Sequence, residues 1–541
     1  MKRILFVLSF LALFAGSAFA ENLKLDKDLN DKVKHGKPTD KVRVIVQLVA
    51  PANATDKAAF AKLGGKSLRN FDLFKAHVLE LPVGLVNELA KYPKVVHISV
   101  DAPMKAHVVG GEPNVVSGAA LATQTYGVTG HGIGVGVIDS GIANHPDLHV
   151  AKAVDFVDST HSGGYDPYGH GTHVAGIIAG SGASAGGQHQ GSAQGVNLVD
   201  LRVLDQNGGG YSSDVIAAIN WAIANRNTVV NGQSLNIRVL NLSMGHRPYE
   251  STDTDPLAQA CRTAVRNGIV VVVSAGNYGK DANGLPMMGG VTSPGNEPSV
   301  ITVGAMTDWG TDTRADDTVA TYSSRGPTAI DHRIKPDIMA PGSHTISTMS
   351  SGSYLATTYP QYMTDGSYMS LSGTSMSAPV ISAGVALMLE KNPGLSPNAT
   401  KAALMFTAES RPEGALFVGA GYANVAGAVN LVANISTGAP AGQNWLINGG
   451  TGLNYNNVIG GTAAVWGQLM NWGTKQYAAN AIFYNTQAWG STIVWDETIV
   501  WDEVVLSGQT IVWDETAIAA ETIVWDETIV WDETIVWGES F

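Results

Sequence analysis

Short apolar runs alternate with helical segments through the middle of the 541-residue chain, and Gly-rich turns separate them. The apolar runs have the length and the Val, Ile and Leu content of strands that are buried on both faces. The predicted strands are 134–138, 198–203, 237–242, 269–273 and 300–303, and the predicted helices are 170–179, 213–225, 255–267 and 377–389. This alternation favours an α/β fold with one doubly wound parallel sheet and helices on both faces.

A serine lies among small residues directly before the last of these helices, in the run Leu-Ser-Gly-Thr-Ser-Met-Ser-Ala-Pro at 371–379. Gly373 allows a tight turn and leaves space beside Ser375. A helix that starts just after Ser375 would hold its hydroxyl in the positive field of the first amides. The same motif could be an ordinary helix cap. A serine hydroxyl becomes a nucleophile only when a base takes its proton, so the chain must also supply that base.

Two upstream motifs supply the partners that such a serine needs. The apolar run Gly-Val-Gly-Val-Ile at 134–138 ends in Asp139, and a Gly-His-Gly-Thr-His motif places His170 at the start of an apolar helix. Functional side chains tend to collect where parallel strands end. Asp139, His170 and Ser375 therefore form a candidate catalytic triad in the chain order Asp, His, Ser.

Further motifs make the resemblance to a known family specific. Ser-Ala-Gly-Asn at 274–277 follows a strand, and the segments 322–327 and 335–342 precede the serine motif in order. Over about residues 120–435 the chain resembles the subtilisin-like serine proteases, or subtilases. The resemblance implies that His170 is the general base for Ser375, that Asp139 orients His170, and that the Asn277 amide donates to the oxyanion.

The resemblance also implies where a peptide substrate would bind. Ser243, Met244 and Gly245 match the family's extended binding segment, and Gly208, Gly209 and Gly210 match the facing edge; Ser274, Ala275 and Gly276 lead to the oxyanion asparagine. Backbone pairing at such edges tolerates many side chains. We therefore expect a broad endopeptidase with an apolar preference at the residue before the cut. His173 is expected to be structural.

The chemistry is expected to need no cofactor and no metal ion. Asp147 matches a residue that the family often uses in a tight calcium site. The loop 180–191, however, contains no Asp, Glu or Asn. Oxygen ligands of that kind are what calcium requires, so a structural calcium site remains possible but unsupported.

The first twenty residues predict a secretory signal peptide. Lys2 and Arg3 precede an apolar run from Ile4 to Phe14, and Ala-Phe-Ala at 18–20 is a small-residue cleavage signal. The apolar run is too short for a membrane anchor. We therefore expect a protein that is secreted or associated with the cell envelope, with no transmembrane anchor.

Residues 21–110 predict a small α+β domain that precedes the catalytic domain at 111–435. Strand-like runs at 41–48, 76–81 and 95–100 alternate with helical spacing at 56–63 and 83–90. This βαββαβ-like pattern resembles the inhibitory propeptide of many secreted subtilases, with cleavage expected between Met104 and Val116. A permanent accessory domain is the alternative.

The C-terminal part of the chain differs in composition from the rest. Residues 436–490 are rich in Gly, Asn, Thr and Ala and predict a linker with irregular strands. In the tail at 491–541, Thr-Ile-Val-Trp occurs six times beside twelve acidic residues, with no Lys or Arg. The chain has a net charge of −13, so −13 − (−12) leaves about −1 outside the tail. The tail is either β-prone and able to self-associate or disordered.

Two other functions fit the sequence less well than proteolysis does. A silent binding protein on the same scaffold would not need the intact set of Asp139, His170, Ser375 and Asn277. A lipase or esterase would show a Gly-x-Ser-x-Gly elbow and the order Ser, Asp, His, neither of which the triad shows. The expected partners are therefore peptide or protein substrates and the chain's own propeptide, with no nucleic acid.

Overall fold

The computed structural model describes residues 22–105, 113–281, 284–438 and 446–478, and three short strands beyond them. Its largest sheet has the strand order β15-β14-β13-β12-β6-β8-β7, with β16 paired to β14. All these pairs are parallel except β14 with β15. The strands are β6 Gly134–Asp139, β7 Val150–Asp155, β8 Asn197–Arg202, β12 Ile237–Leu242, β13 Val270–Ser274, β14 Ile301–Thr307, β15 Thr318–Val319 and β16 Ile338–Pro341. The predicted α/β class with a doubly wound parallel sheet is confirmed.

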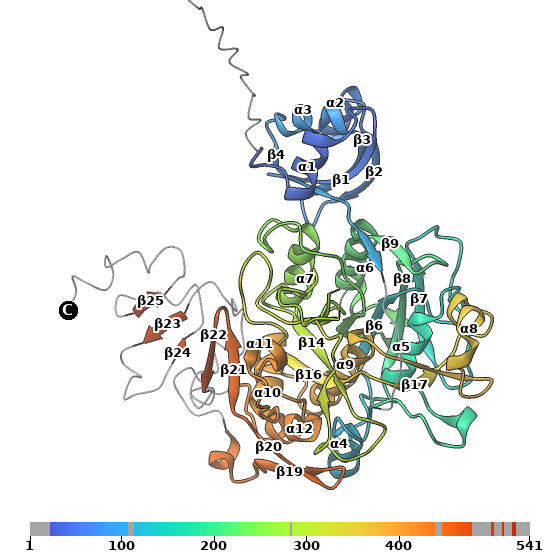
Figure 1. Ribbon diagram of the computed structural model, residues 1–541, viewed down its shortest axis with the longest axis vertical. Helices are drawn as coiled ribbons and strands as arrows, with labels where there is room; N and C mark the ends of the chain where they lie inside the picture. The colour runs from blue at the N-terminus through green and yellow to red at the C-terminus, as the bar shows by residue number, and fades with distance from the viewer. Residues whose placement is uncertain are drawn as a thin grey trace, which may run out of the picture.

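Helices cover both faces of this sheet (Figure 1). Successive strand residues point to opposite faces, so Val272 packs with the α5 and α9 side while Val271 packs with the α6 and α7 side. The larger core lies on the first side and includes α4, α10 and α12. The helices are α4 Ala119–Tyr126, α5 His170–Ala179, α6 Ser212–Asn225, α7 Pro256–Arg266, α8 Tyr354–Thr358, α9 Thr374–Lys391, α10 Pro397–Thr407, α11 Ala415–Val418 and α12 Val425–Ala433.

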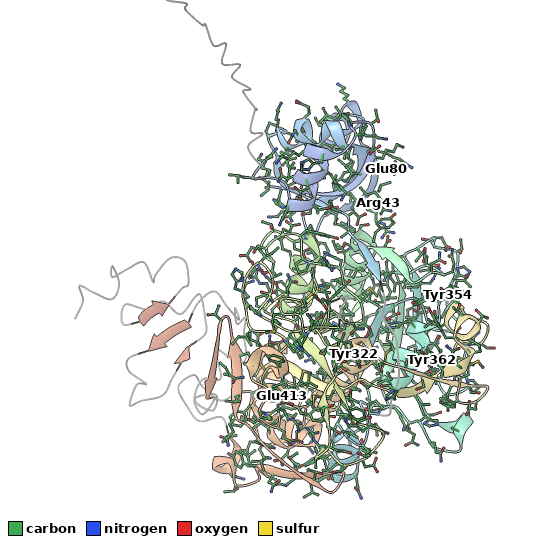
Figure 2. All side chains as sticks on the ribbon, in the orientation of Figure 1. Arg43, Glu80, Tyr322, Tyr354, Tyr362 and Glu413 are labelled. Atoms are coloured by element: carbon green, nitrogen blue, oxygen red, sulfur yellow. The ribbon has the colours of Figure 1, made fainter. Side chains whose placement is uncertain are left out.

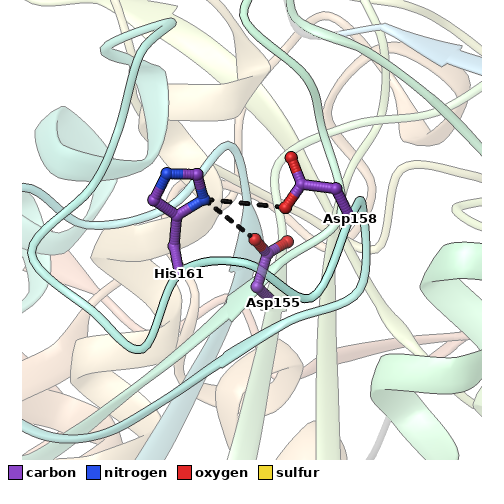
Figure 3. A group of neighbouring side chains, drawn as sticks. All are labelled: Asp155, Asp158 and His161. Carbon is purple, nitrogen blue, oxygen red and sulfur yellow. Dashed lines mark hydrogen bonds and ion pairs between the residues drawn. The ribbon is translucent and has the colours of Figure 1, made fainter.

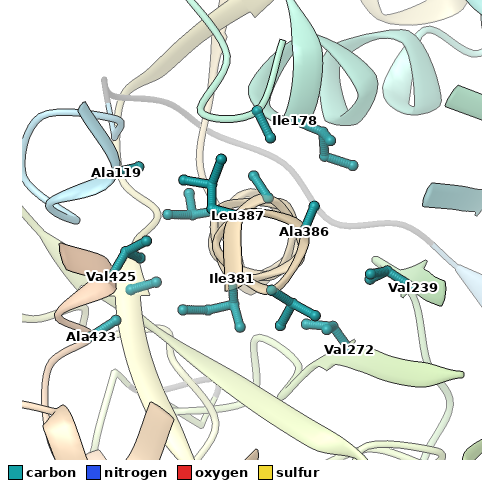
Figure 4. Packing of buried hydrophobic residues seen from close by; sticks show 14 of the residues in the cluster. Ala119, Ile178, Val239, Val272, Ile381, Ala386, Leu387, Ala423 and Val425 are labelled. Carbon is teal, nitrogen blue, oxygen red and sulfur yellow. The ribbon is translucent and has the colours of Figure 1, made fainter. Parts of the chain in front are cut away.

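Helix α9 runs through the middle of the larger core (Figure 4). Every residue from Thr374 to Leu389 is buried, so the helix is enclosed all round. Around Ile381 and Leu387, Figure 4 shows apolar side chains from several directions, among them Ile178, Val272 and Val425. The helix starts three residues earlier than the predicted 377, so Ser375 lies inside its first turn.

The N-terminal domain has its own sheet, in the antiparallel order β2-β3-β1-β4. The order β1-α2-β2-β3-α3-β4 is βαββαβ, and α1 precedes it; no residue range for β2 was predicted from the sequence. A separate apolar core fills the space between this sheet and its helices. The elements are α1 Lys27–His35, β1 Lys41–Leu48, α2 Ala54–Lys62, β2 Lys66–Phe71, β3 Ala76–Pro82, the 3-10 turn η1 Val83–Leu85, α3 Val86–Ala90, β4 Val95–Val100 and β5 Pro103–Lys105.

The outer face of this small sheet packs on helices α6 and α7 of the catalytic domain. Ile45 and Val78 join the apolar cluster that those helices form. Arg43, on the side of the domain that faces the larger domain in Figure 2, lies with its guanidinium 3.6 Å from the centre of the Tyr211 ring. An ion pair of 2.7 Å joins Arg69 to Asp214. Apolar and charged contacts together therefore hold the two domains against each other.

The region that follows α12 contains more structure than the expected linker. Two hairpins pack on the catalytic domain, and their Trp466 and Met470 are buried in its larger core. Trp466 also donates a hydrogen bond of 2.9 Å to Asn457. These hairpins are β19 Asn456–Ile459 with β20 Thr462–Val465, and β21 Leu469–Trp472 with β22 Lys475–Ala478.

Strands also form among the repeats of the tail. The three-stranded sheet β24-β23-β25 pairs segments of three Thr-Ile-Val-Trp copies in antiparallel fashion. The strands are β23 Ile499–Asp502, β24 Ile511–Val512 and β25 Thr522–Trp525. The remaining tail residues, the predicted signal peptide and most of the predicted cleavage region lie outside the described residues.

The remaining elements are short and connect the larger ones. They are the 3-10 turns η2 Ala183–Ala185, η3 Pro360–Tyr362 and η4 Ile447–Gly450, and the strands β9 Gly209–Tyr211, β10 Val229–Val230, β11 Gln233–Ser234, β17 Thr345–Thr348 and β18 Tyr368–Leu371. Among the helices that the structure describes, none is both long enough and apolar enough to cross a membrane.

Candidate active site

The candidate general base, His170, meets the carboxylate expected to orient it, Asp139, at the carboxyl edge of the parallel sheet. Asp139 ends β6, and His170 is the first residue of α5. His170 Nδ1 lies 2.7 Å from Asp139 Oδ1, and both side chains are fully buried. The other ring nitrogen, Nε2, has no hydrogen-bond partner in the described part of the chain. This geometry lets Asp139 hold the tautomer of His170 that leaves Nε2 able to accept a proton.

A second carboxylate, which the sequence analysis did not identify, holds the start of α5 in place. Asp166 accepts hydrogen bonds from Gly169 N at 2.7 Å and from Thr172 N at 2.8 Å. It also accepts from the Ser140 hydroxyl at 2.8 Å, which links it to the residue after Asp139. Burial raises the pKa of Asp166 against these hydrogen bonds. Asp166 lies in an irregular loop. The sequence feature that could have indicated its role is its position four residues before His170.

Gly169 is required at the entry to α5. Its φ of 100° is left-handed, and a Cβ there would lie 2.4 Å from Ser353 Oγ. The Gly-His-Gly motif thus reflects close packing around His170. His173 occupies the next turn, where its Nε2 lies 2.9 Å from Thr345 O and 3.1 Å from Met369 O. Those contacts give His173 a packing role within the core.

Ser375 lies in the first turn of α9, which packs against α5. Its hydroxyl donates to Ser243 O at 2.8 Å, and Ser243 Oγ donates back to Ser375 O at 2.8 Å. The serine is therefore held against the segment that follows β12 rather than bonded to His170. Catalytic hydrogen bonds of this kind often form only when a substrate is bound.

Asn277 reaches the start of the same helix from the end of β13. Its Oδ1 accepts from Thr374 N at 3.0 Å and from Thr374 Oγ1 at 2.9 Å. A backbone N–H can only donate, so these contacts fix which amide atom faces Thr374. The Asn277 nitrogen is then on the opposite side of the amide, where it can donate to another group.

The remaining predicted substrate-binding residues lie on three segments. Ser243, Met244 and Gly245 follow the carboxyl end of β12; Ser274 is the last residue of β13, and Ala275 and Gly276 follow it. Gly208, Gly209 and Gly210 lead into or form strand β9. That strand already has a partner, because β5 of the N-terminal domain pairs with it in antiparallel register, with Met104 opposite Gly210.

Asp147 does not fit a calcium site in this structure. Its Oδ1 accepts from Ser184 N at 2.9 Å and from Ser184 Oγ at 3.0 Å, and its Oδ2 accepts from the Tyr368 hydroxyl. Burial opposes ionisation, but the hydrogen bonds from Tyr368 and Ser184 outweigh it and lower the pKa of Asp147. Hydroxyl and amide donors stand where a calcium site needs oxygen acceptors.

Another acidic group lies beyond the end of β7 (Figure 3). His161 Nδ1 is 3.3 Å from Asp155 Oδ2 and 3.6 Å from Asp158 Oδ1. The Arg202 guanidinium lies 2.8 Å from the same Asp155 oxygen and 3.7 Å from Asp158. A cation of the chain itself therefore neutralises these carboxylates, and the group forms an ion-pair network.

The parallel sheet, the Asp–His pair at its carboxyl edge and the serine in the first turn of α9 are typical of serine hydrolases with the chain order Asp, His, Ser. A family profile described as the subtilase family matches residues 130–428, which is more than half of the chain. The chain therefore belongs to the subtilase family of serine proteases.

Two relatives from Bacillus subtilis (strain 168) illustrate the similarity. The chain is 40% identical to serine protease AprX over 276 residues, which cover 51% of this chain and 60% of AprX. It is 33% identical to subtilisin E over 345 residues, which cover 64% of this chain and 78% of subtilisin E. The chain thus spans less than two thirds of the length of AprX.

A solved structure shows the same fold. It is that of fervidolysin from Fervidobacterium pennivorans, described as a keratinolytic enzyme related to subtilisin. The TM-score is 0.55 at 22% identity, and the match covers 72% of this chain and 61% of fervidolysin. At that identity the likeness supports the fold alone.

Proposed function

We propose that this protein is a serine endopeptidase that is made as a precursor. Ser375 is the nucleophile, His170 the general base and Asp139 the group that orients His170. The observation that carries the proposal is the buried 2.7 Å contact between His170 and Asp139, which leaves His170 Nε2 without a partner. Family membership supports the same chemistry.

The reaction follows from these groups. A bound peptide turns the Ser375 hydroxyl from Ser243 O toward His170 Nε2, which takes the proton as Ser375 Oγ attacks the scissile carbonyl. The carbonyl oxygen becomes an anion, and the Asn277 amide and the Ser375 backbone N–H stabilise it. His170 then gives the proton to the leaving amine, and an acyl-enzyme remains on Ser375. Water, activated by His170 in the same way, hydrolyses the acyl-enzyme.

Peptide binding is proposed at strand β9 and at the segment that includes Ser243, Met244 and Gly245. An extended substrate would add a strand to β9 through backbone hydrogen bonds, which gives broad specificity. The apolar preference at the residue before the cut remains part of this proposal. It rests on the sequence, in which Gly-rich walls leave room for a side chain and no acidic cluster near these segments favours a basic residue.

The N-terminal domain is proposed to inhibit the enzyme until it is removed. Two features support this role: the pairing of β5 with β9 fills an edge that a substrate would use, and the domain packs on α6 and α7. Ser212 N also donates to Ala102 O at 2.9 Å, which continues the backbone contact beyond the paired strands. Export through the predicted signal peptide at 1–20 and cleavage between Met104 and Val116 complete the proposed maturation.

Covalent labelling tests the assignment of the nucleophile. The wild-type chain is treated with a serine-directed phosphonylating reagent, and the adduct is located by peptide mass spectrometry. We expect one adduct, on Ser375, and a strong loss of labelling in His170→Ala, because the base is gone. The matched control His131→Ala, at an exposed histidine, keeps the label. An adduct on another serine would contradict the proposal.

A further inference from the structure

Three arginines line one pocket near the start of strand β12, at the opposite end of this strand from the candidate active site. Arg226 follows α6, Arg238 lies near the start of β12, and Arg266 is the last residue of α7. The pocket has a volume of about 500 Å³, and residues 393–398 form one of its walls. Strand β12 runs from this pocket to Ser243, and its six residues span about 20 Å. The pocket is therefore separate from the proposed peptide site.

The positive charge in this pocket has no counter-charge among the residues that the structure describes. Of the described residues that line it, none is Asp or Glu, and within the described chain no carboxylate lies within ion-pair distance of the three guanidinium groups. Burial, together with the charge of Arg226, lowers the pKa of Arg238. Like charges brought together without a partner are unfavourable, so an anion bound here would relieve that repulsion.

Backbone carbonyls hold two of these arginines in place. Arg238 donates to Pro393 O at 3.2 Å and to Leu395 O at 2.8 Å, and Arg226 donates to Asn267 O. A guanidinium has five N–H groups, so both retain further donors. No hydrogen bond of the described chain engages the guanidinium of Arg266, which lies on the exposed side. Two of the three arginines are thus held in place before a ligand binds, and the side chain of Arg266 can still adjust its position.

The N-terminus of α10 meets the same pocket. Ser396, the N-cap, and Asn398 both line it, and α10 continues for eleven residues. Pro397 has no N–H, and Ala399 N already donates to Ser396 Oγ at 3.1 Å, so the helix end contributes mainly the positive field of its dipole. That field favours the same kind of ligand as the arginines do.

We propose that this pocket binds a multivalent oxyanion of the phosphate class, with Arg226, Arg238 and Arg266 as its ligands. Arginine suits such anions because its planar fork can bond two oxygens at once. The bound anion would join the ends of α6 and α7 to the loop between α9 and α10. Since α9 carries Ser375 at its other end, the anion stabilises the helix on which the proposed nucleophile lies.

Phosphate binding to the full chain tests the proposal. The chain carries Ser375→Ala to prevent self-cleavage, and inorganic phosphate is titrated by calorimetry at constant ionic strength. We expect a single site, and a rise of about 2 °C in Tm at ten times the dissociation constant. Arg266→Gln should weaken binding about tenfold or more, since a charge-assisted bond is lost. The control Lys152→Gln removes one positive charge from an exposed residue outside the pocket and should leave binding unchanged.

Three outcomes would overturn the proposal. The first is no phosphate heat from a chain that unfolds cooperatively. The second is equal binding by Arg266→Gln and Lys152→Gln, which would indicate unspecific charge effects. The third is a fall in Tm for Arg266→Gln in the absence of phosphate, with no phosphate response in the parent. That result would indicate that carboxylates of the acidic tail at 491–541 already fill the pocket. Glycerol phosphate in place of inorganic phosphate distinguishes a phosphomonoester from the free ion.

Discussion

Asn277 shows how a single side chain can combine two roles at the candidate site. Its oxygen is fixed by Thr374, at the turn that precedes Ser375, and its nitrogen is directed to the opposite side. The same contact thus anchors the start of α9 and aims a donor. The sequence motif predicted the donor, whereas the anchor required the folded structure.

The variant Asn277→Asp separates these two roles. The carboxylate still accepts from Thr374 but has no N–H to donate to the oxyanion. We expect kcat to fall by about 10²–10³, as for other lost oxyanion donors, while KM changes little. Stability should stay close to that of the wild type. The exposed control Asn456→Asp should keep full activity. Wild-type kcat in Asn277→Asp would mean that Asn277 serves only to anchor α9.

The role of Asp166 was not predicted from the sequence. The motifs predicted Asp139, His170 and Ser375 because each lies beside a recognisable strand or helix. Asp166 lies in a loop whose neighbours show no periodicity, and its role depends on Ser140 from a distant segment. Contacts of that kind arise from the fold and leave no local pattern in the sequence.

At the scale of elements, apolar periodicity predicted five strands and four helices of the larger domain to within a few residues, but β7, β16, α4, α10 and α12 were not among the predicted elements. It missed α1 and β2, because each has a single buried residue, Leu29 or Phe71. It also predicted a linker where the hairpins β19-β20 and β21-β22 pack on the domain. Trp466 and Met470 anchor those hairpins in the core. The many Gly and Asn residues around them interrupt the apolar alternation by which strands are recognised in a sequence.

The contact between the N-terminal domain and the catalytic domain contains a group that should respond to pH. Asp26 caps α1, and burial together with the charge of Glu250 raises its pKa to about 7. Asp28 adds negative charge, and Glu250 is bonded to His97. The folded chain therefore holds a proton on Asp26 that the unfolded chain releases above about pH 4.

This raised pKa predicts that stability decreases with rising pH. The contribution of Asp26 is complete below about pH 4 and is lost as the pH rises through about 7, with a slope of at most about 1.4 kcal/mol per pH unit. Urea unfolding of the Ser375→Ala chain between pH 5 and 8 measures it. Asp26→Asn retains a capping oxygen and should remove this component of the slope. An unchanged slope in Asp26→Asn would contradict the assignment.

At the scale of the whole molecule, charge is divided unevenly along the chain. The tail at 491–541 holds twelve acidic residues, and the rest of the chain has a net charge of about −1. Three of its repeats pair as strands β23, β24 and β25. Strand pairing among identical repeats can also occur between molecules, and the carboxylates oppose it through repulsion.

Acidification should therefore promote association through the tail. Near pH 4 the carboxylates take up protons, and the repulsion among them falls. We expect the Ser375→Ala chain to show larger particles by light scattering and more β structure by circular dichroism as the pH falls from 7 to 3.5. A matched chain that ends at Gly490, and so keeps the hairpins β19-β20 and β21-β22, should stay monomeric. Equal association of both chains would assign the effect to the folded domains instead.

The proteolytic account as a whole depends on one hydroxyl and on the domain that covers its substrate edge. Casein is incubated with the purified wild-type protein and with Ser375→Ala, and the N-termini of the chain and of the casein fragments are sequenced. The account predicts that the wild type cleaves casein and begins between Met104 and Val116. It predicts that Ser375→Ala is inactive and keeps the whole N-terminal domain. Casein cleavage by Ser375→Ala at the wild-type rate would contradict the account.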